Sequence, residues 1–339
     1  MSIVFLLVAI LSIGLEFTGL CLSLSVQSIG VCYGVNGNNL PSRQEVIDLY
    51  KSNGITGMRI YYPDEEALQA LRGSNIELIL DVPRDTLSSL TDANQATDWV
   101  TKYVTPYSQE VKIKYITVGN EIHPDYNEAQ YVLTALQNIQ NAISAANLQG
   151  QIKVSIAIDM SLIGNSYPPK DGVFTDQAKS YLQPIINFLM NNGAPLLANV
   201  YPYFAYIGNE QSIHLDYALF NQQGNNDAGY QNLFDAQLDS VYAALAQVGG
   251  SNLQIVVSES GWPSAGGDGA TTVDNAATYY NNLINHVKSG NGTPLKPGVA
   301  IETYLFAMFD ENLKSGASTE QHFGVFNPDK SPKYQINFN

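Results

Sequence analysis

Short apolar runs alternate with longer amphipathic stretches along most of the chain. The apolar runs are mostly continuous, which is typical of strands that are covered on both faces, as in parallel sheets. Eight of these runs are predicted to be strands, at residues 29–34, 57–62, 76–82, 113–121, 153–160, 197–203, 254–259 and 300–306. No Pro/Gly/Ser-rich linker divides the alternation, so residues 29–339 are expected to form one domain.

The amphipathic stretches between the runs carry helix start signals. Ser42 and Glu45 have capping-box spacing, and Asp64 places an acidic side chain where a helix dipole favours it. Further helices are predicted at about 94–104, 127–147, 175–191, 230–247 and 274–288. This repeated alternation over about 311 residues predicts a TIM (β/α)8 barrel. An open doubly wound sheet is the alternative, although no Gly-x-Gly-x-x-Gly follows a predicted strand.

One connection between predicted elements is longer than the others. Residues 204–229, which follow the sixth predicted strand, are polar with alternating apolar positions, and this pattern predicts a small hairpin insertion. In barrels the loops that follow the strands build the active-site face. The insertion is therefore expected to form one wall of a substrate cleft.

The N-terminal 28 residues differ from the rest of the chain. Residues 3–13 are almost unbroken apolar residues, and residues 1–28 contain no Lys or Arg. An apolar run this short does not span a bilayer, which takes roughly 20 residues. The pattern favours a secretory signal peptide at residues 1–28 over a buried N-terminal helix. We therefore expect a secreted protein of the apoplast or cell wall, with the vacuole as an alternative and no membrane partner.

Composition and charge narrow the possible partners. The chain carries 16 basic and 31 acidic side chains, a formal net charge of −15, which argues against nucleic acid because phosphate binding needs clustered Lys and Arg. Hydrophobic residues make up 45% of the chain, enough for a large core, and we expect a monomer. The four histidines are scattered and no Cys-x-x-Cys occurs, so neither a metal nor a cofactor is expected.

Two glutamates end apolar runs of the predicted barrel. Glu121 ends the fourth predicted strand and Glu259 ends the seventh. Carboxylates are costly to desolvate, and barrel enzymes keep their functional residues at the C-terminal ends of strands. Either residue alone could belong to a structural ion pair, but two on one barrel face predict a catalytic pair. Glycoside hydrolysis requires such a pair across a cleft, and a carboxyl separation of about 5 Å would imply retention of configuration.

Aromatic and amide side chains gather at the same strand ends. They are Tyr61 and Tyr62 at the end of the second strand, Asn199, Tyr201, Tyr203 and Phe204 at the end of the sixth, Trp262 after Glu259, and Phe306 and Phe309 at the end of the eighth. Aromatic faces can pack on the C–H faces of sugars, while amides and phenols bind sugar hydroxyls. Each aromatic residue alone could be a core residue. Their shared placement at one rim predicts a carbohydrate-binding cleft.

At this point the residues resemble a known family. Residues 256–264, Val-Val-Ser-Glu-Ser-Gly-Trp-Pro-Ser, are similar to the signature of the plant β-1,3-glucanases, family 17 of the glycoside hydrolases. Segments 29–34, 58–61, 118–121, 199–204 and 306–311 also resemble family segments, in the family's order. The resemblance covers essentially all of residues 29–339. It implies a TIM barrel with the two carboxylates on the fourth and seventh strands.

The resemblance also implies an activity and residue roles. The activity is retaining endo-hydrolysis of 1,3-β-D-glucosidic linkages in callose, laminarin or fungal wall glucan, with a role in plant defence or wall remodelling. Glu259 is implied as the nucleophile and Glu121 as the acid/base, with Asn120 positioning the sugar. An acidic pH optimum is expected because Glu121 must be protonated while Glu259 is ionised. The implied lining residues of an open cleft are Tyr61, Tyr201, Phe204 and Phe309.

Glu311 and Lys314 match further family positions at the rim of the eighth strand. From the residues alone, they could form an i, i+3 ion pair, or Lys314 could keep Glu259 ionised through its charge. Glu311 is also a candidate acid, ranked below Glu121 because it follows its strand rather than ending it.

Two alternative functions stay open. A mixed-linkage 1,3-1,4-β-glucanase could use the same scaffold, since cleft-shaping loops decide the linkage preference. A catalytically inactive carbohydrate-binding or storage barrel is the alternative from a different class, and the presence of both Glu121 and Glu259 within full motifs argues against it.

Overall fold

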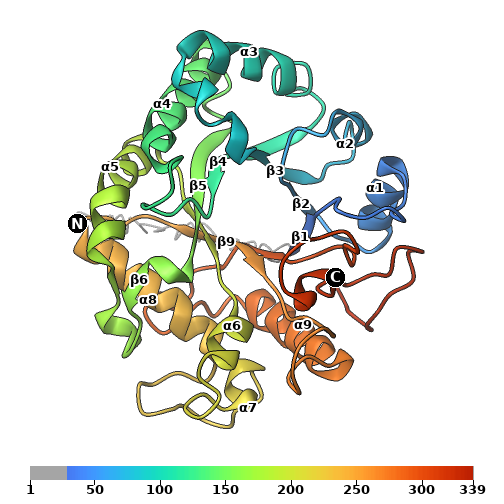
Figure 1. Cartoon of the computed structure of the whole chain (residues 1–339), viewed down its shortest axis with the longest axis vertical. Helices are drawn as coiled ribbons and strands as arrows, with labels where there is room; N and C mark the ends of the chain where they lie inside the picture. Colours follow the sequence, from blue (N-terminus) through green and yellow to red (C-terminus); the bar gives the residue numbers. More distant parts are fainter. Residues whose placement is uncertain (1–28, 339) are drawn as a thin grey trace, which may run out of the picture.

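Eight parallel strands close into a barrel in a computed structural model that describes residues 29–338 (Figure 1). The predicted signal peptide lies outside the described residues. The barrel strands are β1 (Ile29–Tyr33), β2 (Gly57–Ile60), β3 (Glu77–Val82), β4 (Lys112–Asn120), β5 (Lys153–Asp159), β8 (Leu196–Asn199), β9 (Ile255–Ser260) and β10 (Thr303–Leu305). Each strand pairs with the next in this order, and β10 pairs with β1 to close the ring. The predicted TIM barrel is therefore confirmed.

Helices surround the barrel on its outside (Figure 1). They are α1 (Arg43–Ser52), α2 (Glu65–Ala70), α3 (Ala93–Tyr103), α4 (Ala129–Ala145), α5 (Asp176–Asn192), α8 (Leu233–Gln247) and α9 (Val273–Lys288). Short 3-10 segments lie in the connections, at Arg84–Thr86, Ser89–Thr91, Met160–Leu162, Pro169–Asp171 and Ser318–Gln321. The chain that follows β10 runs back beside β1, where the Met308 N–H donates to the Cys32 carbonyl over 2.8 Å.

Local sequence explains where the helices begin. The Ser42 side chain accepts from the Glu45 N–H while the Glu45 carboxylate accepts from the Ser42 N–H, so the predicted capping box is present. Asp64 caps α2 by accepting from the Ala67 N–H. The same device begins other helices, with Asp92 before α3, Thr175 before α5, Asn232 before α8 and Thr272 before α9.

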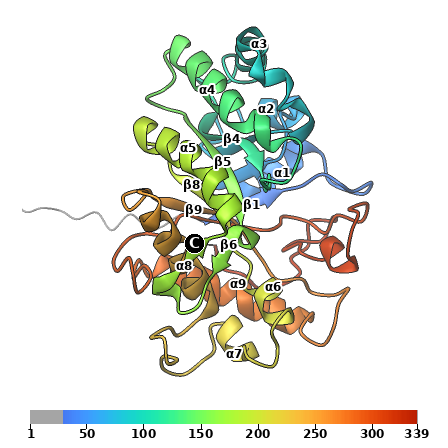
Figure 2. The same cartoon turned by 60° about the vertical axis from the view of Figure 1, so that its left-hand side comes forward.

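The predicted hairpin insertion at residues 204–229 is wrong. This connection instead contains two short helices, α6 (Pro202–Ile207) and α7 (Leu215–Ala218), which pack on each other and on α8 (Figures 1 and 2). Pro202 lacks a backbone N–H and has a helical φ, so it ends β8 early and starts α6. The antiparallel hairpin lies one connection earlier, between β6 (Ile163–Asn165) and β7 (Val173–Phe174).

Strand register shifts at the ends that carry the candidate glutamates. The β4–β5 ladder shifts between Thr117 and Asn120, and the β8–β9 ladder shifts between Ala198 and Asn199. Such irregularities bend a strand and turn its side chains, and they occur often beside active sites. Within residues 29–338, no helix is both long enough and apolar enough to cross a membrane.

Candidate active site

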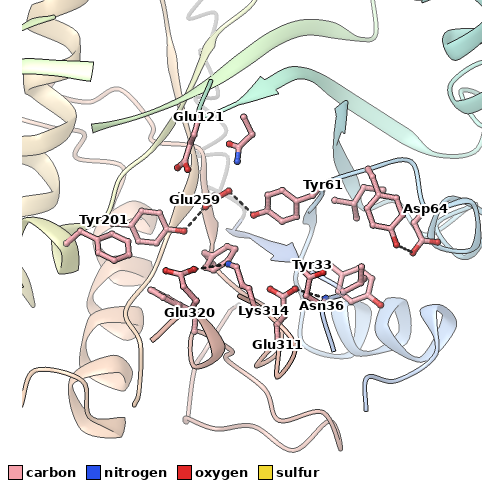
Figure 3. Close-up of a pocket in the computed structure, with 18 residues that line it drawn as sticks. Tyr33, Asn36, Tyr61, Asp64, Glu121, Tyr201, Glu259, Glu311, Lys314 and Glu320 are labelled. Atoms are coloured by element: carbon pink, nitrogen blue, oxygen red, sulfur yellow. Dashed lines mark hydrogen bonds and ion pairs between the residues drawn. The ribbon is translucent and has the colours of Figure 1, made fainter. Parts of the chain in front are cut away.

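A pocket of about 420 Å³ opens at the C-terminal ends of the barrel strands and contains both candidate glutamates (Figure 3). Glu121 follows β4 directly, and Glu259 is the last residue but one of β9. Both carboxylates point into the same pocket, although 138 positions separate them in the chain. The lining residues come from the ends of β1, β2, β4 and β9 and from the segments that follow β1, β2, β4, β8 and β10.

Glu121 is held in an environment that favours its protonated form. Burial, followed by the negative charge of Glu259, raises the pKa of Glu121 to about 7. The Asn199 amide donates to Glu121 Oε1 over 2.8 Å, which opposes this rise by stabilising the carboxylate. The Glu121 backbone has a φ of 52°, in the left-handed region that non-glycine residues seldom adopt. This conformation lies where β4 has already left regular pairing, and such strain is concentrated at functional sites.

Glu259 is surrounded by donors that stabilise a carboxylate. Arg59 Nη1 lies 2.9 Å from Glu259 Oε1, and the Tyr61 hydroxyl donates to the same oxygen over 2.8 Å. The Tyr201 hydroxyl donates to Oε2 over 2.6 Å. Figure 3 shows the two tyrosines on opposite sides of Glu259. Three donors, one of them charged, therefore hold this carboxylate in place.

Arg59 is a functional residue that the sequence reasoning missed. Its side chain is completely buried in β2, and it pairs with both Asp81 and Glu259, at 2.7 and 2.9 Å. Its Nη2 also donates to Asn120 Oδ1 over 2.9 Å. A single arginine within the apolar run 57–60 was the available signal, because an unpaired buried charge is too costly to keep. Asp81 is the equivalent missed acid in β3.

Asn120 and Asn199 connect the two glutamates. Asn120 lines the pocket, and its Oδ1 accepts from both Arg59 and the Asn199 amide, whereas its amide nitrogen has no hydrogen bond to any side chain or backbone group of residues 29–338. Asn199 is 1% exposed and does not line the pocket that holds Glu259. It lines a smaller adjoining cavity, where its amide contacts Glu121. Asn199 thus holds Glu121 in position. A sugar could contact Asn199 only in the adjoining cavity, not in the pocket that holds Glu259.

An aromatic wall forms on the β8 side of the pocket. Tyr201 packs against Phe204, Phe306 and Phe323, with ring centroids 5.3, 6.2 and 5.9 Å away. Phe204 is 42% exposed and lines the pocket, so its ring is accessible to a sugar. Tyr61 lines the opposite side. The structure therefore brings together the predicted residues Tyr61, Tyr201 and Phe204, and adds Phe323.

Two predicted aromatic contacts need correction. Trp262 is 0% exposed, and its Nε1 donates to the Ala270 carbonyl within a cluster that includes Tyr203 and Tyr279. Phe309 is 2% exposed and packs edge-on against Tyr33. Neither side chain lines the pocket. Trp262 supports the wall indirectly, through Tyr203, which packs on Phe204, whereas Phe309 packs on Tyr33 of β1.

Glu311 and Lys314 both line the pocket, but they do not form the predicted ion pair. Lys314 Nζ instead lies 3.1 Å from Glu320 and 4.2 Å from the centre of the Phe306 ring (Figure 3). The Asn36 N–H donates to Glu311 over 2.8 Å, and burial raises the pKa of Glu311. The ion-pair partner of Glu259 is Arg59, so the role predicted for Lys314 belongs to Arg59. Among residues 29–338 no group of three or more His, Cys, Asp or Glu side chains could hold a metal ion.

Comparisons with known proteins agree with this geometry. The sequence model described as glycosyl hydrolases family 17 matches residues 29–338. The chain is 57% identical to the glucan endo-1,3-beta-glucosidase acidic isoform GI9 of Nicotiana tabacum, over 99% of this chain and 98% of that protein. It is 67% identical to a glucan endo-1,3-beta-glucosidase of Glycine max, over 75% of this chain and 98% of that protein. The structure of CJP38, a beta-1,3-glucanase and allergen of Cryptomeria japonica pollen, superimposes with a TM-score of 0.89 at 48% identity, covering 92% and 99% of the two chains.

Proposed function

The chain belongs to glycosyl hydrolase family 17, and from this premise we propose that it hydrolyses internal 1,3-β-D-glucosidic linkages of β-1,3-glucans with retention of configuration. The relatives at 57% and 67% identity are named glucan endo-1,3-beta-glucosidases, which supports the proposed specificity for 1,3 linkages. The observation that carries the mechanism is the contrast between two carboxyls in one pocket. Burial favours the protonated form of Glu121, whereas Glu259 is held by hydrogen bonds from Arg59, Tyr61 and Tyr201.

The contrast assigns the roles in the first step. Glu259 attacks C1 of the sugar, and the C1–O bond to the leaving chain breaks as Glu121 gives its proton to that oxygen. The product of this step is a glycosyl ester on Glu259. The Asn120 oxygen is held by Arg59 and Asn199, and this leaves the Asn120 amide nitrogen to donate to a hydroxyl of the attacked sugar.

The second step reverses the proton flow. Ionised Glu121 accepts a proton from a water molecule as the water oxygen bonds to C1, and the Glu259 carboxylate leaves. Two displacements at C1 restore the original anomeric configuration. Arg59 and the hydroxyls of Tyr61 and Tyr201 stabilise the departing carboxylate through the contacts that they already make.

Product analysis tests this proposal directly. We expect laminarin hydrolysed by the wild-type protein to yield β-anomeric ends first, as followed by proton NMR before mutarotation. Glu259→Ala should abolish turnover, and added azide should yield a glycosyl azide of inverted configuration. Retained configuration at a near wild-type rate from Glu259→Ala would contradict the assigned nucleophile. Efficient cleavage of barley mixed-linkage glucan but not laminarin would contradict the 1,3 linkage, and no cleavage of either would indicate a binding protein.

Secretion is the remaining part of the proposal. The apolar N-terminal segment favours export to the apoplast or cell wall, with the vacuole as the second destination. A fluorescent reporter fused behind residues 1–28 should leave the cytosol of a plant cell. Cytosolic retention of the reporter would contradict the predicted signal peptide. A role in defence or wall remodelling depends on this destination.

A further inference from the structure

The cleft continues past Glu121 into two further cavities. The first, of about 420 Å³, is lined by Glu121, Tyr201 and Phe204 and extends to Gln237 of α8. The second, of about 680 Å³, is lined in part by residues of α6, α7 and α8 and shares Met160, Ala205 and Gln237 with the first. Their volumes fall within the range of small-molecule binding sites. The glutamate pocket and these cavities therefore form one continuous depression, with Gln237 at the junction of the two cavities.

Gln237 has an unpaired buried end. The residue is 7% exposed, and its Oε1 is buried without a hydrogen-bond partner among residues 29–338. The two ends of an amide have the same shape, so exchanging them would leave a buried donor unpaired instead. Buried polar groups in folded proteins are nearly always paired, and an exception calls for an explanation. A ligand hydroxyl that can donate or accept would satisfy either end.

The order of the glutamates indicates which part of a substrate reaches these cavities. Glu121 protonates the oxygen that leaves with the departing chain, so that chain extends on the side of Glu121 away from Glu259. The cavity beside Glu121 and Gln237 lies on this side, on the β8 and α8 edge of the cleft. Tyr33, Asn36 and Tyr62 lie on the other side of Glu259, where the attacked chain would continue.

We propose that Gln237 is a specificity-determining residue whose amide binds a hydroxyl of the leaving glucan chain, in the cavity between Glu121 and α8. The ligand is a neutral 1,3-linked glucosyl unit. Phe204 supports this placement because it lines both the glutamate pocket and the first cavity, with a half-exposed ring across which a chain can stack. The inference rests on the proposed function, because it assumes that Glu121 is the acid.

The test compares two substrates that differ only in the leaving group. Laminarihexaose leaves a glucan chain in the cavity, whereas an activated aryl glycoside of laminaritriose leaves a nitrophenolate that offers Gln237 no sugar hydroxyl. Gln237→Leu should lower kcat/KM for laminarihexaose roughly threefold to tenfold, the range for one neutral hydrogen bond, and leave the aryl glycoside unchanged. Cleavage of hexaose labelled with oxygen-18 at its reducing end should also shift toward shorter leaving groups.

A matched control comes from the same helix. Gln247 also lies in α8, but its amide donates to the Gly172 carbonyl over 2.9 Å and the residue lines neither cavity. Gln247→Leu should leave the substrate ratio and the cleavage pattern unchanged. Gln237→Leu should unfold at a temperature no lower than wild type, because it replaces an unpaired polar group with an apolar one. Gln237→Met serves the same purpose if the leucine variant does not fold.

Several results would overturn the proposal. An equal loss on both substrates with an unchanged cleavage pattern would show that Gln237 is only structural, and no loss on either would show that it does not contact the leaving chain. Both outcomes leave the proposed function intact. If the wild-type protein cleaves no β-1,3-glucan, the proposed function fails and this inference fails with it.

Discussion

Arg59 provides the positive charge at the base of the site. Its guanidinium pairs with Asp81 and Glu259, and it also donates to the oxygens of Asn120 and Asn199. Two carboxylates and one guanidinium in a buried space remain stable only as a set, because removing one member leaves the others desolvated and unpaired. Arg59 therefore links β2 to its neighbours and holds the Glu259 carboxylate, the proposed nucleophile, in position.

Replacing this residue should affect both properties. Arg59→Met should lower the free energy of unfolding by about 3–5 kcal/mol, the cost of a broken buried pair, and reduce kcat roughly 100-fold through misplacement of Glu259 and Asn120. Urea denaturation and laminarin kinetics measure the two effects. Arg72→Met is the control, since Arg72 pairs with Glu110 at the surface and its loss should cost less than about 1 kcal/mol. A folded Arg59→Met protein with normal kcat would contradict the assigned role.

In the proposed mechanism, the raised pKa of Glu121 sets the alkaline side of the activity profile. Because the acid must be protonated, kcat/KM should fall tenfold for each pH unit above about 7. Glu259 contributes to this pKa through its negative charge, so Glu259→Gln should lower the pKa of Glu121. Carbon-13 NMR of the Glu121 carboxyl in both proteins measures the shift. An unchanged or raised Glu121 pKa in the variant would contradict the coupling.

The same group makes folding stability depend on pH. The Glu121 pKa is about 7 in the folded chain and about 4.3 in an unfolded one. The free energy of unfolding is therefore highest below about pH 4, where Glu121 is protonated in both states, and falls as pH rises through about 7. Glu121→Gln should equal wild type at pH 4 and exceed it at pH 8, by on the order of 3 kcal/mol. Urea unfolding at both pH values measures the difference. Equal stability of the two proteins at pH 8 would show that burial of Glu121 is not costly.

At the scale of elements, barrel closure depends on contact between one tyrosine and the glycines of two neighbouring strands. Tyr304 of β10 lies across Gly30 of β1, where a Cβ would come within 2.2 Å of the ring. Gly57 of β2 lies beneath the same ring, with a corresponding distance of 3.0 Å. The ring fills the interior only because these two positions carry no side chain.

A single methyl group at this contact should loosen the barrel. Gly30→Ala should lower the free energy of unfolding by about 1–3 kcal/mol through overpacking, and by less in a Tyr304→Leu background. Gly150→Ala is the control, because a Cβ there meets nothing within 4 Å, and its effect should stay within about 0.5 kcal/mol. Thermal and urea unfolding of the variants measure these values. Equal costs of Gly30→Ala in the two backgrounds would contradict the assigned contact.

At the scale of the whole molecule, a net charge of −15 accompanies a substrate that carries no charge. Long-range electrostatics should then contribute little to substrate encounter. We expect kcat/KM on laminarin to change less than about twofold between about 10 and 300 mM NaCl. Carboxymethylated laminarin, which is anionic, should instead be cleaved slowly at low salt and faster as salt screens the repulsion. Strong salt dependence on native laminarin would contradict recognition by neutral contacts.

Much of the architecture could be predicted from local pattern. The apolar runs located all eight barrel strands, and Ser42, Glu45 and Asp64 marked helix starts that the structure contains. The predicted strand ends were less accurate. Strand β8 stops at Asn199 because Pro202 begins a helix, and β10 is shorter than its apolar run. Periodicity reports whether a side chain is covered, so it predicts elements well and their ends less well.

The sequence by itself determined the barrel, the two glutamates at strand ends and the aromatic residues around them. Only the tertiary structure decided which partners meet. Arg59 contacts residues 22, 61, 140 and 200 positions away, Lys314 pairs with Glu320 rather than Glu311, and Phe204 is exposed while Trp262 is buried. A local sequence pattern gives the spacing of residues along the chain, but it does not give the distance in space between the ends of different strands. Closure of the barrel sets that distance, and it thereby determines the chemistry of each carboxylate.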